Sequence, residues 1–324
     1  MTTARGTVAQ DVSVVVSTMH RPEALGRCLA ALRRADVGPA EIVVVDQSMD
    51  DRTRAVVMRC VGDGMPIRYH RLATPGLGAS QNAGVTMATR PIVAITDDDC
   101  EVDASWLAVI AGTFAADPRL DVVTGRVLPL PPEGDRIHPV ASRLSTRRRD
   151  FDRYRAPWVV GSGNNFAVRR ATYLRIGGCD ERLGPGSPAR GGVDMDLFYR
   201  LLRAGARIRY EPDSIVHHGR QSRAQRLARR PMYGMGMGAC CALRLRERDG
   251  HALRLLADWM WLRLRQVAHA ARRADGGALH EEWLMLRGTV TGLRHGLRAA
   301  ARPPSPHSPT SSQRGADPGD RTIW

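Results

Sequence analysis

The first half of the chain alternates short apolar runs with stretches of helical periodicity. Val12–Ser17 is rich in β-branched residues, which is typical of a strand buried on both faces. Four apolar residues then recur at helical spacing: Leu25, Cys28, Leu29 and Leu32. Pro22 stands where a first helical turn accepts proline, and a second β-branched run follows at Glu41–Asp46. Residues 12–46 therefore predict one strand–helix–strand unit.

The same alternation continues to residue 127. The pattern predicts a weaker strand at Ile67–Arg71, a glycine-led helix ending near Ala88, a strand at Pro91–Thr96, a helix at Ala104–Ala115 and a strand at Asp121–Val127. Strands that alternate with helices in this way are typical of an α/β protein with a mostly parallel sheet flanked by helices.

The second half of the chain is less regular. Residues 128–157 are rich in proline and arginine and predict a long surface loop. Order returns at 158–170, and an amphipathic helix is expected at Asp194–Ala204, just before Gly205. Residues 222–302 predict helix throughout. The proline- and serine-rich tail from Pro303 is expected to be disordered.

The positive charge is concentrated in one region. The 324 residues carry 48 Lys+Arg, all of them arginine, against 33 Asp+Glu, for a net charge of +15. Residues 220–302 hold 17 of the arginines and 6 acidic residues, which places +11 of that charge there. No recognised nucleic-acid-binding module accompanies the charge, so we expect no nucleic-acid partner.

Cysteine usage and hydropathy bear on the compartment. The six cysteines form no C-x-x-C pair and are expected to be reduced thiols. The pattern contains no secretory signal and no apolar stretch of about 18 residues or more that could span a membrane. We therefore expect a cytoplasmic protein.

Polar residues follow three of the predicted strands. These are Ser17 and Thr18, then Asp46, and then Asp97–Asp99. Open parallel sheets bind ligands at the carboxyl ends of their strands. Adjacent carboxylates repel one another, and hard oxygen ligands at this density suit Mg²⁺ or Mn²⁺. Alternation along the chain places Asp97 and Asp99 on the same side.

Simpler interpretations remain open for both acidic positions. Asp46 has the residue type that forms turns, and Asp97–Asp99 could be a solvated acidic turn. The sequence contains no G-x-x-x-x-G-K-[ST] motif, and no G-x-G-x-x-G follows a strand, which argues against P-loop and dinucleotide-binding functions.

Taken in order, these segments resemble the family-2 glycosyltransferases of the GT-A fold. The matching segments are 12–22, 43–50, 78–84, 95–100, 163–170, 177–181, 192–197, 210–212 and 217–218. The resemblance covers about residues 11–220. It implies an inverting transferase that moves a sugar from a nucleoside-diphosphate sugar to an acceptor hydroxyl in cell-envelope, polysaccharide or glycolipid synthesis.

The resemblance also implies a domain organisation. Residues 11–220 would form the GT-A catalytic domain, with a nucleotide-binding half at 11–127 and an acceptor and catalytic-base half at 158–220. Residues 221–302 would be a basic helical extension, and 303–324 a disordered tail.

The same resemblance implies roles for individual residues. Thr18, Arg21 and Asp46 would hold the donor nucleoside, Asp97 its ribose, and Asp99 a Mn²⁺ or Mg²⁺ ion on the diphosphate. The donor-binding set also includes Gln81 and Asp98. His218 matches a position that assists the metal or the diphosphate, although a packing histidine is the simpler interpretation. Asp194 matches the catalytic base.

Two departures from the family pattern concern this assignment. Val193 stands where the family usually has Glu before the base, and Gln81 replaces a customary Arg. Gln81 can donate hydrogen bonds but adds no charge. These departures motivate one alternative, a non-catalytic sugar-nucleotide-binding or scaffold protein, but neither of them touches Asp99 or Asp194. A nucleotidyltransferase is a further alternative, but such proteins usually have a glycine-rich loop where Thr18–Pro22 stands.

Asp196 competes with Asp194 for the role of base. On a helix the two side chains point about 200° apart, so only one of them can face the site. A favourable interaction with the helix dipole is sufficient to explain Asp196. Asp194 is the better candidate because it stands at the start of the helix, just after Gly191–Gly192.

The basic extension has two interpretations. Residues 252–271 predict an amphipathic helix, and Trp259 and Trp261 together with arginine suit a membrane interface. Packing of the helix on the catalytic domain is the alternative. The expected partners are thus a sugar nucleotide, an acceptor glycan or lipid-linked saccharide, and the inner face of a membrane through peripheral contact.

Overall fold

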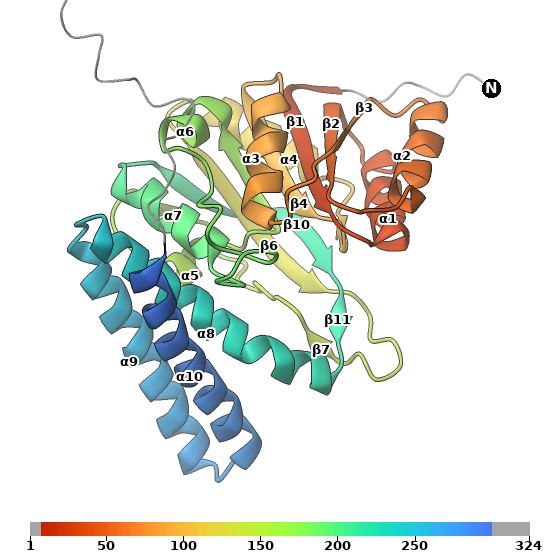
Figure 1. Cartoon of the computed structure of the whole chain (residues 1–324). Coiled ribbons are helices and arrows are strands. Elements are labelled where there is room, and N and C mark those ends of the chain that lie inside the picture. The colour runs from red at the N-terminus through yellow and green to blue at the C-terminus, as the bar shows by residue number, and fades with distance from the viewer. Residues whose placement is uncertain (1–7, 300–324) are drawn as a thin grey trace, which may run out of the picture.

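A nine-stranded sheet forms the centre of the protein (Figure 1), whose computed structural model describes residues 8–299. The strands follow one another in the order β3 (Ile67–Arg71), β2 (Gly38–Asp46), β1 (Val8–Thr18), β4 (Ile92–Asp97), β9 (Asn165–Arg169), β6 (Val122–Pro129), β10 (Ile208–His218) and β5 (Cys100–Val102). The short β8 (Arg149–Phe151) also pairs with β10. Six strands run in one direction, whereas β5, β8 and β9 run against them. The predicted mostly parallel α/β sheet is therefore confirmed.

Helices cover both faces of this sheet. They are α1 (Pro22–Arg33), α2 (Arg52–Gly62), α3 (Leu77–Met87), α4 (Trp106–Ala116), α5 (Pro157–Val160), α6 (Arg170–Arg175) and α7 (Val193–Arg203). Alternate residues of β1 enter two separate cores, since Val14 and Val16 pack in one cluster and Val15 in the other. Burial on both faces explains why this strand is a continuous apolar run.

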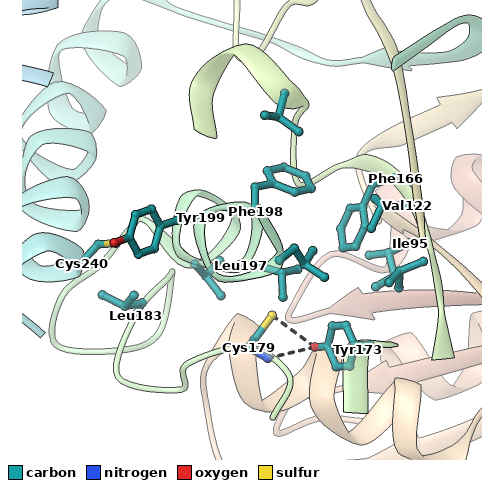
Figure 2. Packing of buried hydrophobic residues seen from close by; sticks show 14 of the residues in the cluster. Ile95, Val122, Phe166, Tyr173, Cys179, Leu183, Leu197, Phe198, Tyr199 and Cys240 are labelled. Carbon is teal, nitrogen blue, oxygen red and sulfur yellow. Dashed lines mark hydrogen bonds between the residues drawn. The ribbon is translucent and has the colours of Figure 1, made fainter. Parts of the chain in front are cut away.

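The second core joins the sheet to α7. Figure 2 shows Phe198 of α7 directed at Phe166 of β9, and the two rings meet edge to face with centroids 5.5 Å apart. Leu197 and Tyr199 are also fully buried here. This packing fixes α7, and with it Asp194, against the centre of the sheet.

Some elements differ from the sequence expectation. Strand β10 was not predicted because its middle residues, Glu211–Ser214, are polar or proline. A register shift between Glu211 and Ile215 interrupts its pairing with β6. Helix α2 was also missed. The expected loop at 128–157 contains β8 and the two-residue β7 (His138–Pro139), which pairs with β11 (Arg220–Gln221).

Three long helices follow the sheet. They are α8 (Arg223–Arg246), α9 (His251–Arg272) and α10 (Gly276–Arg298), so the predicted helical region is broken at two short turns. Helices α8 and α10 pack side by side at glycines: a Cβ on Gly238 would overlap the carbonyl oxygen of Thr289, and one on Gly292 that of Met235. Glycine is therefore required for this close approach. Within residues 8–299, no helix combines the length and apolar character needed to cross a membrane. The tail predicted to be disordered lies outside the described residues.

Candidate active site

The register of the central strands brings three of the predicted positions to one edge. Thr18 pairs with Asp46 across β1 and β2, and Ser17 pairs with Asp97 across β1 and β4. All three strands end here, so Thr18, Asp46 and Asp97 lie at the carboxyl edge of the sheet, where α/β proteins bind ligands.

Asp98 faces inward from this edge. Its carboxylate accepts hydrogen bonds from the Thr18 hydroxyl at 2.8 Å and from Arg21 Nη1 at 3.1 Å. Burial raises the pKa of Asp98, while the Arg21 guanidinium opposes the shift. Asp98 therefore holds Thr18 and Arg21 in place. Arg21 also reaches Asp99 Oδ2 at 3.1 Å, so one guanidinium links two of the three carboxylates.

Four potential metal ligands gather beside Asp98. Single ligand atoms of Asp97, Asp99, Cys100 and His218 all lie within 4.8 Å of one another. His218 Nε2 is 3.4 Å from Asp99 Oδ1. Burial and the charges of Asp99 and Asp98 raise the pKa of Asp97 well above its ordinary value. A divalent cation would relieve that repulsion, and two carboxylates with an imidazole fit Mn²⁺ or Mg²⁺.

Cys100 is a member of this cluster that the sequence analysis did not single out as a ligand. It is fully buried, and it pairs with His218 across β5 and β10. Cross-strand partners share one face of a sheet. The signal that could have identified Cys100 is its position directly after Asp99, but the strand that brings it to His218 was not predicted.

Asp46 and Gln81 both form hydrogen bonds with other residues of the protein. Asp46 is fully buried and accepts hydrogen bonds from the Ser48 amide at 2.8 Å and the Tyr69 hydroxyl at 2.7 Å. The contact with the Ser48 amide is the one expected of a turn-forming aspartate. Gln81, 3% exposed, accepts a hydrogen bond from the Cys179 thiol at 3.2 Å, so its carbonyl faces the loop before α7.

Asp194 lies in the first turn of α7. Gly192 precedes the helix with a φ of 83°, a left-handed conformation that favours glycine. The Asp194 carboxylate accepts hydrogen bonds from the amides of Gly163 at 3.2 Å and Met195 at 2.9 Å. Burial raises its pKa despite these bonds. The charge of Asp194 also contributes to the raised pKa of Asp97, so the candidate base lies within electrostatic range of the metal-ligand cluster.

Val193 is buried in the apolar interior. It is 4% exposed and belongs to the core that joins α7 to the sheet, and a Cβ added to Gly184 would lie 3.1 Å from its Cβ. The side chain that departs from the family pattern therefore fills the apolar interior.

Asp196 has a different role from the one expected. It is fully buried, with Arg200 Nε 2.7 Å from one carboxylate oxygen and Arg244 Nε 3.2 Å from the other. The helix-dipole explanation is incomplete, because these ion pairs join α7 to α8. Asp196 cannot act as the base, since its oxygens face the arginines.

The two tryptophans of α9 have separate environments. Trp259 is 6% exposed, meets Trp158 edge to face at 5.6 Å and donates a hydrogen bond to Thr289 Oγ1 at 2.9 Å. Trp261 is 64% exposed. The packing interpretation holds for Trp259, whereas Trp261 faces outward.

Comparisons with known proteins give one family. Residues 13–176 match the model of "Glycosyl transferase family 2". The "Pre-mycofactocin glycosyltransferase" of Mycobacterium tuberculosis H37Rv is 31% identical over 254 residues, which cover 74% of this chain and 49% of that protein. The chain thus spans about half the length of this relative.

A second relative and a solved structure are also similar to this chain. The "Glucosyl-dolichyl phosphate glucuronosyltransferase" of Haloferax volcanii is 24% identical over 237 residues, covering 64% of this chain and 68% of that protein. The mannosyltransferase PcManGT of Pyrobaculum calidifontis, solved with GDP-Man and Mn²⁺, superposes with a TM-score of 0.60 at 18% identity, covering 87% of each chain. The superposition shows a shared GT-A fold.

Proposed function

The chain belongs to glycosyl transferase family 2, and from this premise we propose that it transfers a sugar from a nucleoside-diphosphate sugar to an acceptor hydroxyl with inversion. One observation carries the proposal: the carboxylates of Asp97 and Asp99 and the imidazole of His218 gather within 4.8 Å of one another at the carboxyl edge of the sheet. The candidate base Asp194 stands in the first turn of α7. The relative solved with GDP-Man and Mn²⁺ supports the kind of donor and metal.

Asp194 is assigned the chemical step on the acceptor. Its carboxylate accepts the proton of the acceptor hydroxyl as that oxygen attacks the anomeric carbon. The Gly163 and Met195 amides hold the carboxylate in one orientation. A single base and a single displacement invert the configuration at that carbon.

The other edge residues are assigned to the donor. Thr18, Arg21 and Asp46 hold the nucleoside, Asp97 contacts the ribose, and Asp99 and His218 hold the cation. A bound divalent cation would stabilise the charge that develops on the departing diphosphate. Arg21 reaches Asp98 and Asp99 together and therefore orients the acidic edge before the donor arrives.

The acceptor that we propose is a glycan or a lipid-linked saccharide, met at a membrane surface. Support comes from the dolichyl phosphate in the name of one relative and from the outer face of α9. Leu253, Ala257, Trp261 and Leu264 recur at helical spacing on that face and are all exposed. Arg265 and Arg272, also exposed, flank them. Exposed tryptophan beside arginine suits an anionic membrane interface.

The proposal is tested by a panel of sugar nucleotides, with and without Mn²⁺. We expect one donor to raise the melting temperature and to be hydrolysed slowly in a Mn²⁺-dependent manner. With an acceptor found, the anomeric proton coupling of the product in NMR reports inversion or retention. Donor binding without turnover across a broad acceptor panel would favour the scaffold alternative. Turnover of nucleoside triphosphate with sugar phosphate would favour the nucleotidyltransferase.

A further inference from the structure

Cys100 adds a thiol, which is a soft ligand, to the metal-ligand cluster. A site for Mn²⁺ or Mg²⁺ does not need this ligand. Those ions prefer oxygen ligands and keep open positions for substrate, whereas a thiolate favours zinc. The Cys100 sulfur is fully buried, yet it lies within 4.8 Å of ligand atoms of Asp97, Asp99 and His218.

The four ligand atoms are close enough together to surround one ion. Zinc–ligand bonds of about 2.0–2.3 Å place the ligand atoms of a tetrahedron roughly 3.3–3.8 Å apart. The four atoms lie within 4.8 Å of one another, so they would have to draw together around a bound zinc ion. They also come from three strands of one sheet, β4, β5 and β10, and from the turn between β4 and β5.

The imidazole is already oriented for metal binding. His218 Nδ1 lies 3.2 Å from the carbonyl oxygen of Gly219, and a hydrogen on Nδ1 is donated to that oxygen. In the neutral tautomer with this hydrogen, the lone pair of Nε2 is on the side of Asp99, whose Oδ1 is 3.4 Å away. A second partner that fixes the tautomer is a usual feature of metal-binding histidines.

We propose that Asp97, Asp99, Cys100 and His218 bind Zn²⁺ as a closed four-ligand site, and that zinc held in this way inhibits the enzyme. The Cys100 thiol releases its proton to solvent when the sulfur binds the metal. With four protein ligands, zinc has no open position for the donor diphosphate, as in structural zinc sites. The binding claim stands on the cluster alone, and only the inhibition rests on the proposed function.

The binding claim is tested with Co²⁺ as a spectroscopic substitute for zinc. We expect the wild-type chain to give a thiolate-to-cobalt charge-transfer band in the near ultraviolet and intense visible bands of tetrahedral cobalt, both removed by one equivalent of Zn²⁺. Cys100→Ser and Cys100→Ala should lose the charge-transfer band and bind Zn²⁺ at least ~10-fold more weakly in calorimetry. Cys60→Ser, which alters a half-buried thiol on α2, should keep both properties.

Melting curves of all variants establish that a lost charge-transfer band is not caused by unfolding. Two substitutions at Cys100 are used so that at least one variant remains folded.

Inhibition is measured separately, and we expect Zn²⁺ to block Mn²⁺-dependent turnover of wild type at least ~10-fold more strongly than that of Cys100→Ser. A wild-type cobalt spectrum without the thiolate band, or a band that persists in a folded Cys100 variant, would overturn the zinc site. A wild-type cobalt spectrum with the thiolate band, but no turnover of any donor, would instead count against the proposed function alone.

Discussion

Arg244 of α8 and Asp196 of α7 form a buried ion pair, with Arg244 Nε 3.2 Å from Asp196 Oδ1. The same guanidinium contacts Asp180 and lies 2.9 Å from Glu247, and Arg200 holds the other oxygen of Asp196 at 2.7 Å. Asp196 is only two residues from Asp194. The helical extension therefore fixes the first turn of α7, in which the proposed base stands.

Replacing Arg244 by Leu should lower the free energy of unfolding by about 3 kcal/mol, because it leaves buried carboxylates with one partner fewer. This is the lower end of the usual cost, since Arg182 and Arg200 still contact Asp180 and Asp196. Urea denaturation measures the change. Arg265→Leu, an exposed arginine on α9, is the matched control and should change stability by less than about 0.5 kcal/mol. Equal stability of the two variants would contradict a stabilising role for the Arg244 network.

The sequence predicted the regular parts of the fold because their burial is uniform. The Val12–Ser17 run lies between two cores, so every residue in it had to be apolar or small, and the pattern was unambiguous. The amphipathic α7 was equally clear. By contrast, β10 carries Glu211 and Asp213 beside a register shift, and its periodicity is lost there.

Part of the candidate site was predictable because polar residues stand at the ends of predicted strands, as at Thr18 and Asp46. Asp97–Asp99 was found because three carboxylates follow one strand. Cys100 was not assigned to the cluster, since its pairing with His218 depends on a strand contact between distant segments. The ion pair of Asp196 with Arg244 likewise joins separate helices, and no local pattern distinguishes it from a helix-dipole interaction.

Gly236→Ala should destabilise the protein and slow transfer. A Cβ at this position would lie 2.5 Å from the backbone nitrogen of Gly192, so α8 and the turn before Asp194 would have to separate. Such overpacking typically costs about 1–3 kcal/mol. Thermal unfolding and kcat are the measurements.

The control is Gly112→Ala in α4, where an added Cβ meets no atom within 4 Å and should stabilise the helix by roughly 1 kcal/mol. If Gly236→Ala were as stable and as active as wild type, the close contact between α8 and Gly192 would not matter for the site.

Asp194→Asn should leave donor affinity nearly unchanged and lower turnover by about 10²- to 10⁴-fold, because the amide cannot accept the acceptor proton. Asp196→Asn should instead lower stability, through its lost ion pairs with Arg200 and Arg244. Calorimetric donor binding is compared with transfer or donor hydrolysis for both variants. Equal turnover in wild type and Asp194→Asn would defeat the base assignment.

The pH dependence of turnover follows from the burial of Asp194. Burial raises its pKa above the ordinary aspartate value of about 3.9, and the base acts only when ionised. Turnover should therefore fall as the pH decreases through this raised pKa, at a higher pH than an exposed aspartate would give. The measurement is kcat/KM between pH 4 and 8, values roughly spanning the usual carboxylate and histidine range. A profile flat down to the ordinary value would exclude Asp194 as the titrating base.

Asp99→Ala should remove the metal dependence of donor binding. Asp99 supplies one of the two carboxylates that lie in the cluster with His218, and its loss leaves a weaker ligand set for the cation. Calorimetric titration of the sugar nucleotide, with Mn²⁺ and with a chelator, should show a metal effect in wild type and little or none in the variant. Asp50→Ala, an acidic residue whose carboxylate contacts Arg52, is the control and should retain the metal effect. Equally tight Mn²⁺-dependent binding by Asp99→Ala would refute the metal assignment.

The outer face of α9 should bind anionic membranes in a salt-sensitive manner. Figure 1 shows α9 and α10 side by side at the edge of the molecule away from β3, and on α9 the exposed fractions are 60% for Leu253, 64% for Trp261 and 54% for Leu264. Each arginine near an anionic leaflet contributes about 1 kcal/mol, within a Debye length of the surface. We expect flotation with anionic liposomes at low salt and release at high salt, and none with neutral liposomes.

The double variant Trp261→Ser and Leu264→Ser should lose most of this binding, because the arginines alone leave no apolar contact with the acyl region. Met49→Ser, a 90% exposed apolar residue in the turn before α2, should float as wild type does. Failure of the wild-type chain to float at low salt, or equal flotation of the double variant, would reject α9 as the contact surface.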